Sequence, residues 1–237
     1  MRILVWNIRN RSEARTPRIV EEIAAHDPDV IALGGYREPR SPRFHVAQEL
    51  RQRGWVHVET SNPAEGENGI AVLACTPLKR RRTFGARWLD LDLPGHGFGI
   101  GILQIPAAVG GIRSEATLAK RRLWDALLEA AEDRRGEPFL FAGSWNTGSH
   151  RIDEKGQTFV CNQQFEKLSA IGWCDLWRHH HPGSTEWTWY SNQGNGFRVD
   201  HAFGSPALVS RVVGCRYSHA ERAAKVSPHS IVLIEID

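Results

Sequence analysis

The chain has 237 residues, 41% of them apolar, so it is long and apolar enough to bury a core, and we expect one domain over residues 1–237. Its 30 Lys and Arg against 27 Asp and Glu give a net charge of only +3, well short of the basic surface of a non-specific duplex-binding protein. Nucleic acid is therefore a possible partner but not a favoured one. The four cysteines are isolated, without a CxxC pair, which argues against a disulfide framework or a structural zinc site.

No apolar run approaches the length of a membrane span, and Met1 leads directly into an apolar segment without a basic leader. We therefore expect a cytoplasmic protein with no membrane contact. The sequence leaves the oligomeric state open.

Short apolar runs predict seven strands, and periodic segments predict four helices between them. The clearest helix covers residues 114–134, where Ser114 is a capping residue and apolar residues recur at spacings of three and four. In chain order the predictions are strand 3–6, helix 17–25, strand 30–33, helix 43–53, strands 69–74 and 99–105, helix 114–134, strand 139–143, helix 162–171, and strands 199–203 and 231–236. This mixture is typical of a layered α/β fold with helices outside sheets.

Two further segments carry charge or imidazole without forming a predicted element. The run Lys79–Arg82 follows a proline and is interpreted as a solvated turn, with contact to nucleic acid as the less favoured alternative. The run His179–His181 precedes Pro182 and Gly183, and is interpreted as a loop rather than a metal cluster.

The dipeptide Trp-Asn follows a predicted strand twice, at Trp6-Asn7 and at Trp145-Asn146. Two strands that end in the same dipeptide can bring both Asn amides to one pocket at the strand ends. The alternative is coincidence in a chain that contains nine tryptophans.

Six segments, in this order and spacing, resemble the endonuclease/exonuclease/phosphatase superfamily: RILVWNIRN (2–10), DPDVIALGGY (27–36), ENGIAVLACTPL (67–78), FLFAGSWNTG (139–148), GNGFRVDHAF (194–203) and SPHSIVLIEI (227–236). The resemblance implies a DNase I-like, four-layer α/β sandwich of two facing mixed sheets. It also implies cleavage of phosphodiester or phosphomonoester bonds with Mg²⁺ or Mn²⁺.

The sequence departs from this family's pattern at three acidic positions. Gly35 stands where the family has a metal-binding Glu, Ser144 where it has the Asp of its GDxN motif, and Pro228 where it has the Asp of its SDH motif. Arg9 adds a cation, which would repel a divalent ion. Because Mg²⁺ is held by carboxylates and substrate oxygens, we expect a degenerate metal site and no metal or other cofactor. The alternative is retained Mg²⁺ or Mn²⁺, with Asn7 and Glu38 as fallback ligands.

Other family positions are retained, and they suggest chemistry without a metal. In the family, the Asp that matches Asp200 hydrogen-bonds the His that matches His229, and a His oriented by a carboxylate is a general acid/base. The predicted catalytic set is His229 and Asp200, with Asn7 and Asn146 as polarising amides. The alternative is that the pair persists only as a structural contact in a dead site.

The remaining predicted site residues surround this set and would bind a small substrate. They are Arg9, Tyr36, Gln104, Ser144, Trp145, Trp189 and Arg198, although Arg198 is also a candidate brace for the sheet. The favoured hypothesis is a metal-independent acid/base enzyme acting on a small aromatic or carbonyl-containing molecule, in a bacterial biosynthetic pathway. Two alternatives stay open: a Mg²⁺- or Mn²⁺-dependent phosphodiesterase or nuclease, and a non-catalytic protein that binds a nucleotide or small ligand.

Overall fold

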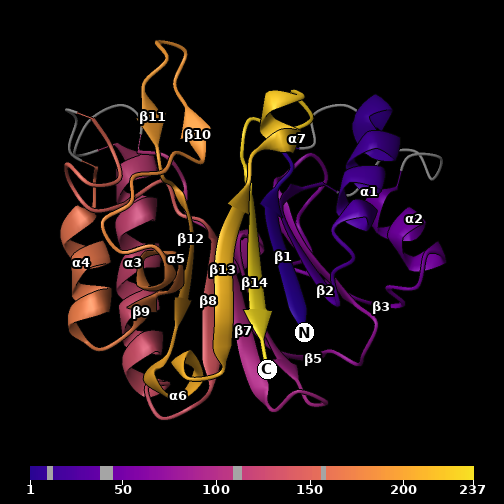
Figure 1. Ribbon diagram of the computed structural model, residues 1–237, viewed down its shortest axis with the longest axis horizontal. Helices are drawn as coiled ribbons and strands as arrows, with labels where there is room; N and C mark the ends of the chain where they lie inside the picture. Colours follow the sequence, from indigo (N-terminus) through magenta and orange to yellow (C-terminus); the bar gives the residue numbers. More distant parts are fainter. Residues whose placement is uncertain (10–12, 38–44, 109–113, 156–158) are drawn as a thin grey trace.

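The computed structural model describes residues 1–9, 13–37, 45–108, 114–155 and 159–237. Two six-stranded sheets face each other in the middle of the molecule, with helices outside both of them (Figure 1). The first sheet has the order β13 (Val212–Ser218), β14 (Ile231–Ile236), β1 (Arg2–Asn7), β2 (Val30–Tyr36), β4 (Gly69–Ala74) and β3 (His57–Thr60). The second has the order β5 (Lys79–Thr83), β6 (Trp88–Leu93), β7 (Phe98–Gln104), β8 (Phe139–Ser144), β12 (Asp200–Gly204) and β9 (Cys174–Asp175). The predicted four-layer sandwich is confirmed.

Both sheets are mixed, because each contains one parallel pair among antiparallel neighbours. The parallel pairs are β1 with β2 and β7 with β8. Each is joined through a helix on the outer face, α1 (Thr16–Ala25) for the first pair and α3 (Glu115–Asp133) for the second. All seven predicted strands and all four predicted helices are present, within a few residues at each end. The predicted helix at 43–53 is α2 (Val46–Gln52); residues 43 and 44 lie outside the described ranges.

Three apolar clusters match the layers. The largest lies between the two sheets and includes Ile3, Val5 and Ile100. A second packs the first sheet against α1 and α2, and a third packs the second sheet against α3 and α4 (Asn162–Ala170). Helix α3 forms where it was predicted because Ser114 Oγ accepts a hydrogen bond from Thr117 N–H at 3.2 Å, and because its apolar face is buried under the sheet.

The structure corrects two predictions about polar runs. The predicted turn at Lys79–Arg82 is β5, an exposed edge strand whose arginines pair with Glu59, Asp90, Asp92 and Glu137. The predicted loop at His179–His181 lies mostly in the short helix α5 (Leu176–His180), which begins because Asp175 caps its N-terminus. His181 follows the helix and donates to the carbonyl of Cys215.

The remaining elements are short. They are the hairpin β10 (Trp189–Tyr190) and β11 (Gly196–Phe197), which projects beyond the sheets (Figure 1), helices α6 (Pro206–Val209) and α7 (Ala220–Ala223), and the 3₁₀ turns η1 (Glu13–Arg15) and η3 (Gly85–Arg87). Within the described part of the chain, none of the helices combines the length and apolarity needed to cross a bilayer.

Candidate active site

One cavity, of about 360 Å³, lies where the ends of β1, β2, β7 and β8 meet. Its polar lining is of three kinds: four side-chain amides, two guanidinium groups and one imidazole. They belong to Asn7, Asn68, Gln104 and Asn146, to Arg9 and Arg87, and to His229. The two Trp-Asn dipeptides thus deliver both amides to one cavity, as the sequence suggested.

The strand pleat explains why Asn7 faces the cavity and Trp6 does not. Successive side chains of β1 alternate between faces, so Trp6 packs on the helix side of the sheet and Asn7 lies on the inner side. Asn7 Oδ1 accepts a hydrogen bond from the backbone N–H of Arg9 at 3.2 Å, which fixes the orientation of the amide.

His229 and Asp200 form a buried pair at the wall of this cavity. The Nδ1 atom of His229 lies 3.0 and 3.1 Å from the two carboxylate oxygens of Asp200. Since a carboxylate is only an acceptor, Nδ1 carries the proton. The Nε2 atom is then an acceptor, and the Nδ2 atom of Asn7 lies 3.4 Å from it. The predicted pairing is present, and it leaves Nε2 as the basic atom of the site.

The backbone around His229 is held by its neighbours in the chain and by β1. Its N–H donates to Ser227 Oγ, and the Ser227 hydroxyl donates in turn to the carbonyl of Asn7 at 2.6 Å. The indole N–H of Trp6 donates to the carbonyl of His229 at 3.0 Å. Thus the indole that lies outside the cavity still positions the imidazole.

Asp200 is held in the same way from the opposite side. Its backbone N–H donates to Thr188 Oγ1, and its carbonyl accepts from the Tyr217 hydroxyl at 2.8 Å. Asp200 and His229 are only 3% and 4% exposed. Their geometry is therefore set before any ligand arrives.

Asn146 has a left-handed backbone, with φ of 47°. Its Nδ2 atom donates to the carbonyl of Ile105 at 2.8 Å, which leaves one N–H and the Oδ1 atom for other partners. Its own carbonyl accepts from Lys120 Nζ, on α3. Lys120 is 1% exposed, and this burial lowers the pKa of its ammonium to about 8. Lys120 was not predicted as a site residue, because a single Lys in a helical pattern carries no local signal.

Arg87 lines the cavity, although the sequence did not indicate it as a site residue. It ends η3 and stands directly before β6, a strand that was not predicted. Arg9, Gln104 and Trp189, which were predicted, do line the cavity. The carbonyl of Gln104 accepts the N–H of Gly35 at 3.1 Å, so Gln104 also ties β7 to β2.

Four predicted substrate-binding residues do not line the cavity, and each has a structural reason. Tyr36 follows a bulge in β2 and is buried in the cluster under α2. Trp145 is fully buried against Trp124 and Phe203. Ser144 is buried opposite Asp200, and its Oγ has no hydrogen-bond partner in the described part of the chain.

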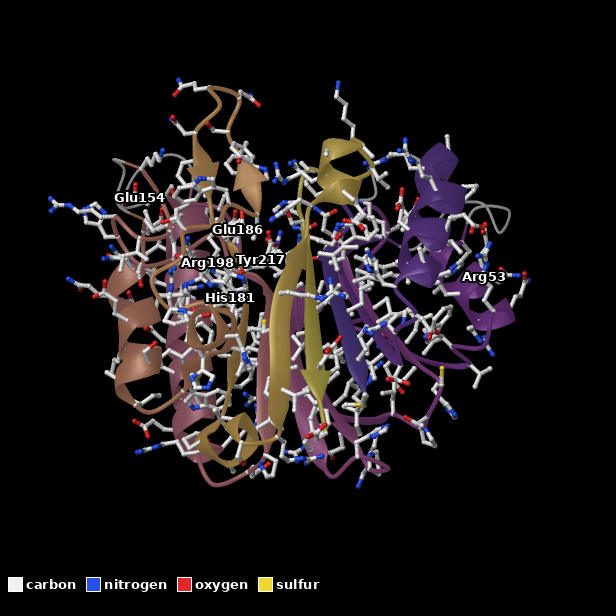
Figure 2. All side chains as sticks on the ribbon, viewed as in Figure 1. Arg53, Glu154, His181, Glu186, Arg198 and Tyr217 are labelled. Atoms are coloured by element: carbon white, nitrogen blue, oxygen red, sulfur yellow. The ribbon has the colours of Figure 1, made fainter. Side chains whose placement is uncertain are left out.

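Arg198 is the fourth predicted residue that does not line the cavity. It braces the sheet, which was the alternative role considered for it. Its guanidinium contacts both Asp153 and Asp175, and it is 1% exposed. Burial raises the pKa of the Asp175 carboxyl, but the charge of Arg198 outweighs burial and holds that pKa below its ordinary value. Arg198 also lies within 3.4 Å of the Tyr217 hydroxyl, and Figure 2 shows the two side chains together.

A site for Mg²⁺ or Mn²⁺ requires oxygen donors, carboxylates above all. The described lining residues include no carboxylate, and the described ranges hold no cluster of three or more His, Cys, Asp or Glu side chains suited to a metal ion. Glu38, the fallback ligand, lies outside the described residues. At Gly35 the backbone has φ of +64°, and a Cβ there would lie 2.7 Å from Asn7 Oδ1. This backbone leaves no room for a Glu at position 35.

Three solved structures share this fold over the whole chain. The 3′ phosphatase NExo from Neisseria, bound to product DNA hairpin, is 22% identical with a TM-score of 0.85, and covers 100% of this chain and 99% of its own. The 3′-5′ exonuclease NExo from Neisseria meningitidis is 20% identical with a TM-score of 0.84, with 100% of both chains covered. An AP endonuclease from Archaeoglobus fulgidus is 18% identical with a TM-score of 0.83, and covers 100% of this chain and 99% of its own.

At these identities the structures establish the fold alone. The family itself is established by a sequence model, that of the Endonuclease/Exonuclease/phosphatase family, which matches residues 4–229. This range contains every lining residue named above, and His229 is its last residue. The chain therefore belongs to the endonuclease/exonuclease/phosphatase family.

Proposed function

We propose that this protein is an acid/base enzyme that works without a metal ion on a small, anionic, carbonyl-containing molecule, with His229 Nε2 as the atom that accepts and returns the proton. The observation that carries the proposal is the buried His229–Asp200 pair at a cavity whose described lining has guanidinium and amide groups but no carboxylate.

The pair suits a general base. When Nε2 takes a proton, the imidazole becomes a cation at a cavity that Arg9 and Arg87 also line, which is unfavourable unless the charge is compensated. Asp200 provides that compensation at Nδ1, at 3.0 Å. An anionic substrate would compensate the charge of the arginines at the same time.

The amides suit the orientation of a polarised oxygen. The second N–H of Asn7 and that of Asn146 lie at the same cavity and are donors without charge. Hydrogen bonds from such fixed donors stabilise negative charge that develops on a carbonyl or phenol oxygen. Arg87 supplies a guanidinium for a carboxylate or phosphate of the substrate.

The donor set described here is a poor match for Mg²⁺ or Mn²⁺. Such ions take carboxylate and water oxygens, whereas the cavity presents amide oxygens that already accept backbone N–H groups at Asn7 and Gln104. The guanidinium of Arg87 at the same cavity opposes a further positive charge. No catalytic step is therefore assigned to a metal.

The test is turnover in excess EDTA, compared between the protein and His229→Gln, which keeps a polar side chain of similar length. A small-molecule extract would be incubated with each protein and followed by mass spectrometry, with para-nitrophenyl acetate as a defined carbonyl probe. We expect the unmodified protein to consume at least one anionic compound in EDTA, and His229→Gln to be slower by about 10² or more. Equal rates for the two proteins, or turnover abolished by EDTA, would refute the proposal.

A second candidate is phosphoester cleavage with Mg²⁺ or Mn²⁺, and the family membership and the guanidinium-lined cavity favour it. Titrating Mn²⁺ into the protein with bis(para-nitrophenyl) phosphate or a DNA hairpin separates it from the first. Cleavage that depends on Mn²⁺ and saturates with it would establish the second candidate. NMR signals of the His229 ring that stay sharp when Mn²⁺ is added would count against it, because a bound Mn²⁺ broadens the signals of nearby nuclei.

A further inference from the structure

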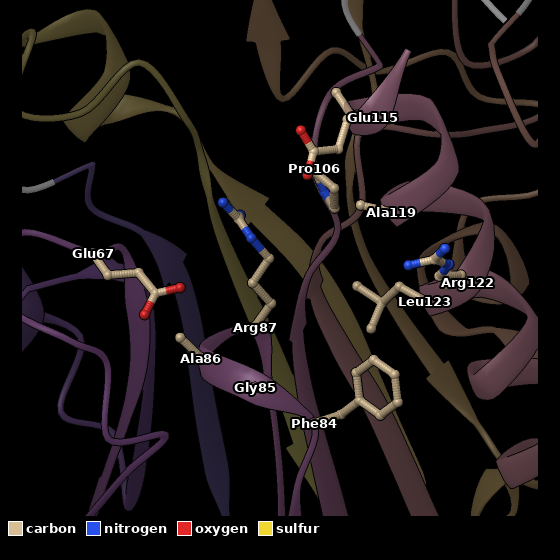
Figure 3. A pocket seen from close by; sticks show the side chains of 11 residues that line it. Glu67, Phe84, Gly85, Ala86, Arg87, Pro106, Glu115, Ala119, Arg122 and Leu123 are labelled. Carbon is tan, nitrogen blue, oxygen red and sulfur yellow. The ribbon is translucent and has the colours of Figure 1, made fainter. Parts of the chain in front are cut away.

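A second hollow, of about 670 Å³, adjoins the catalytic cavity, and Arg87 and Pro106 line both (Figure 3). Its walls are η3 on one side and the first turns of α3 on the other. None of the chemistry assigned to His229 requires this hollow.

The hollow has an apolar interior. The side chains of Phe84 and Leu123 point toward each other across it, with Ala119 beside them (Figure 3). Phe84 is 50% exposed although its ring lies only 6.2 Å from that of Trp88. A half-exposed phenyl group on the wall of a hollow gains apolar contact when a ligand covers it.

Arg87 stands at the junction and is held there by the fold. The carbonyl of Ala86, its neighbour, accepts from Ser61 Oγ at 2.7 Å, and the same hydroxyl accepts the N–H of Ile70 on β4. The 3₁₀ turn is thereby fixed to the first sheet. The guanidinium extends between Glu67 and Pro106 (Figure 3), where it can reach a group in either space.

Two carboxylates, those of Glu67 and Glu115, also line the hollow. The Oε2 atom of Glu67 accepts the N–H of Ala64 within its own loop, at 3.1 Å. On the other wall, Arg122 adds a second guanidinium. The hollow therefore combines an apolar interior with guanidinium and carboxylate groups in its lining, next to the catalytic cavity.

We infer that the substrate has two parts: an anionic head, which binds in the catalytic cavity against Arg87, and an apolar or aromatic body, which lies in the second hollow between Phe84 and Leu123. This rests on the proposed function, because it takes the catalytic cavity as the place of reaction. Both volumes fall within the roughly 300–1,000 Å³ usual for small-molecule sites.

The test compares two probes by calorimetry in excess EDTA: inorganic phosphate, which is only a head, and naphthyl phosphate, which adds an aromatic body. We expect naphthyl phosphate to bind at least about tenfold more tightly, because its rings remove apolar surface from water. Arg87→Gln should weaken the binding of both probes.

Two matched variants in α3 test where the apolar body of the substrate binds. Ala119→Phe adds a ring inside the hollow, whereas Leu118→Phe adds one at an exposed neighbour that lines neither space. Ala119→Phe should bring the affinity for naphthyl phosphate to within about threefold of that for phosphate and leave phosphate unchanged. Leu118→Phe should change neither. Equal affinity for the two probes, or no effect of Ala119→Phe, would overturn the inference.

The same measurement on His229→Gln separates this inference from the proposed function. If that variant still prefers naphthyl phosphate while the unmodified protein shows no EDTA-resistant turnover, the two-part site stands and the catalytic proposal fails. If turnover depends on His229 but the two probes bind equally, only the two-part site fails.

Discussion

Two polar clusters meet at the start of β12, and they differ in how their charges are matched. The closed cluster around Arg198 contains two arginines, Arg178 and Arg198, and two carboxylates, Asp153 and Asp175, in contact with one another. The open cluster around His229 faces a cavity whose described lining has guanidinium groups without a carboxylate. The charges of the first cluster are matched within the fold, whereas the second faces the cavity in which the proposed anionic substrate would bind.

Removing the cation should break the closed cluster, with the largest effect. Arg198→Met would leave Asp153 and Asp175 buried without their main partner, so we expect the free energy of unfolding to fall by about 3–5 kcal/mol. Urea denaturation measures it. The control is Arg178→Met, whose side chain is 26% exposed and should cost about 1 kcal/mol or less. Similar losses in the two variants would show that the closed cluster is not what stabilises this region.

A buried histidine beside the closed cluster should make the stability depend on pH. His201 is fully buried beside the closed cluster, and burial, followed by the charge of Arg198, lowers its pKa to about 4 from an ordinary 6.5. Between these values the unfolded chain binds a proton that the folded protein does not. Stability is therefore complete above pH 6.5 and falls as the pH drops toward 4, by roughly 3 kcal/mol.

Denaturation from pH 7 to 4 checks this, with His201→Gln as a variant that cannot titrate. Its amide can still donate to the carbonyl of Thr147, which His201 Nε2 contacts at 2.7 Å. The variant should lose less stability over this range than the unmodified protein. Parallel curves would mean that His201 is not the group responsible.

Gly34 and Gly35 are neighbours that both lie close to Asn7 at the catalytic cavity, so the same substitution can be compared at the two positions. Gly34→Ala would add a Cβ at ordinary contact distance, 3.8 Å from Asn7, and should cost about 1 kcal/mol or less. Gly35→Ala would combine a left-handed backbone with a Cβ 2.7 Å from Asn7 Oδ1, and should cost about 1–3 kcal/mol. Urea denaturation compares them, and NMR signals of the His229 ring should move only in Gly35→Ala. Equal costs would contradict the crowding at Asn7.

Lys120→Met should have the smallest effect on stability. The variant removes a buried ammonium, which is favourable, and also the hydrogen bond to the Asn146 carbonyl, which is not, so we expect a change within about 1 kcal/mol at pH 7. Denaturation at pH 7 measures it. The same variant should loosen the segment of Asn146, seen as faster exchange of nearby amide protons. A large loss of stability with unchanged exchange would exclude a positioning role for Lys120.

The strands and helices were predictable where a local pattern specifies them. The apolar run in β8 and the Ser114 cap of α3 identify those elements without tertiary information. Strand β13 was missed because its buried and exposed residues do not alternate regularly, and its pairing with β14 contains a bulge between Val212 and Gly214. Strand β5 was missed because four consecutive cationic residues indicate that a segment is exposed to solvent but do not indicate its backbone conformation.

The site residues were predictable where a motif ends a strand. They were not predictable where tertiary packing decides which way a side chain points. Asn7, Asn146, Asp200 and His229 meet as the motifs suggested, although their catalytic roles remain predictions. Trp145 was misplaced because the sequence does not show which face of the chain turns toward α3 after Ser144. Arg87 was missed because only the fold brings the turn before β6 to the cavity.

Strand β5 has a consequence for how copies of this molecule meet. It forms one border of the second sheet, where backbone groups would otherwise offer a template to a neighbouring strand. Lys79, Arg80, Arg81 and Arg82 stand exposed along it. A second copy that paired along this border would have to bury these charged side chains and the carboxylates that the arginines contact, so the border resists the growth of a continuous intermolecular sheet.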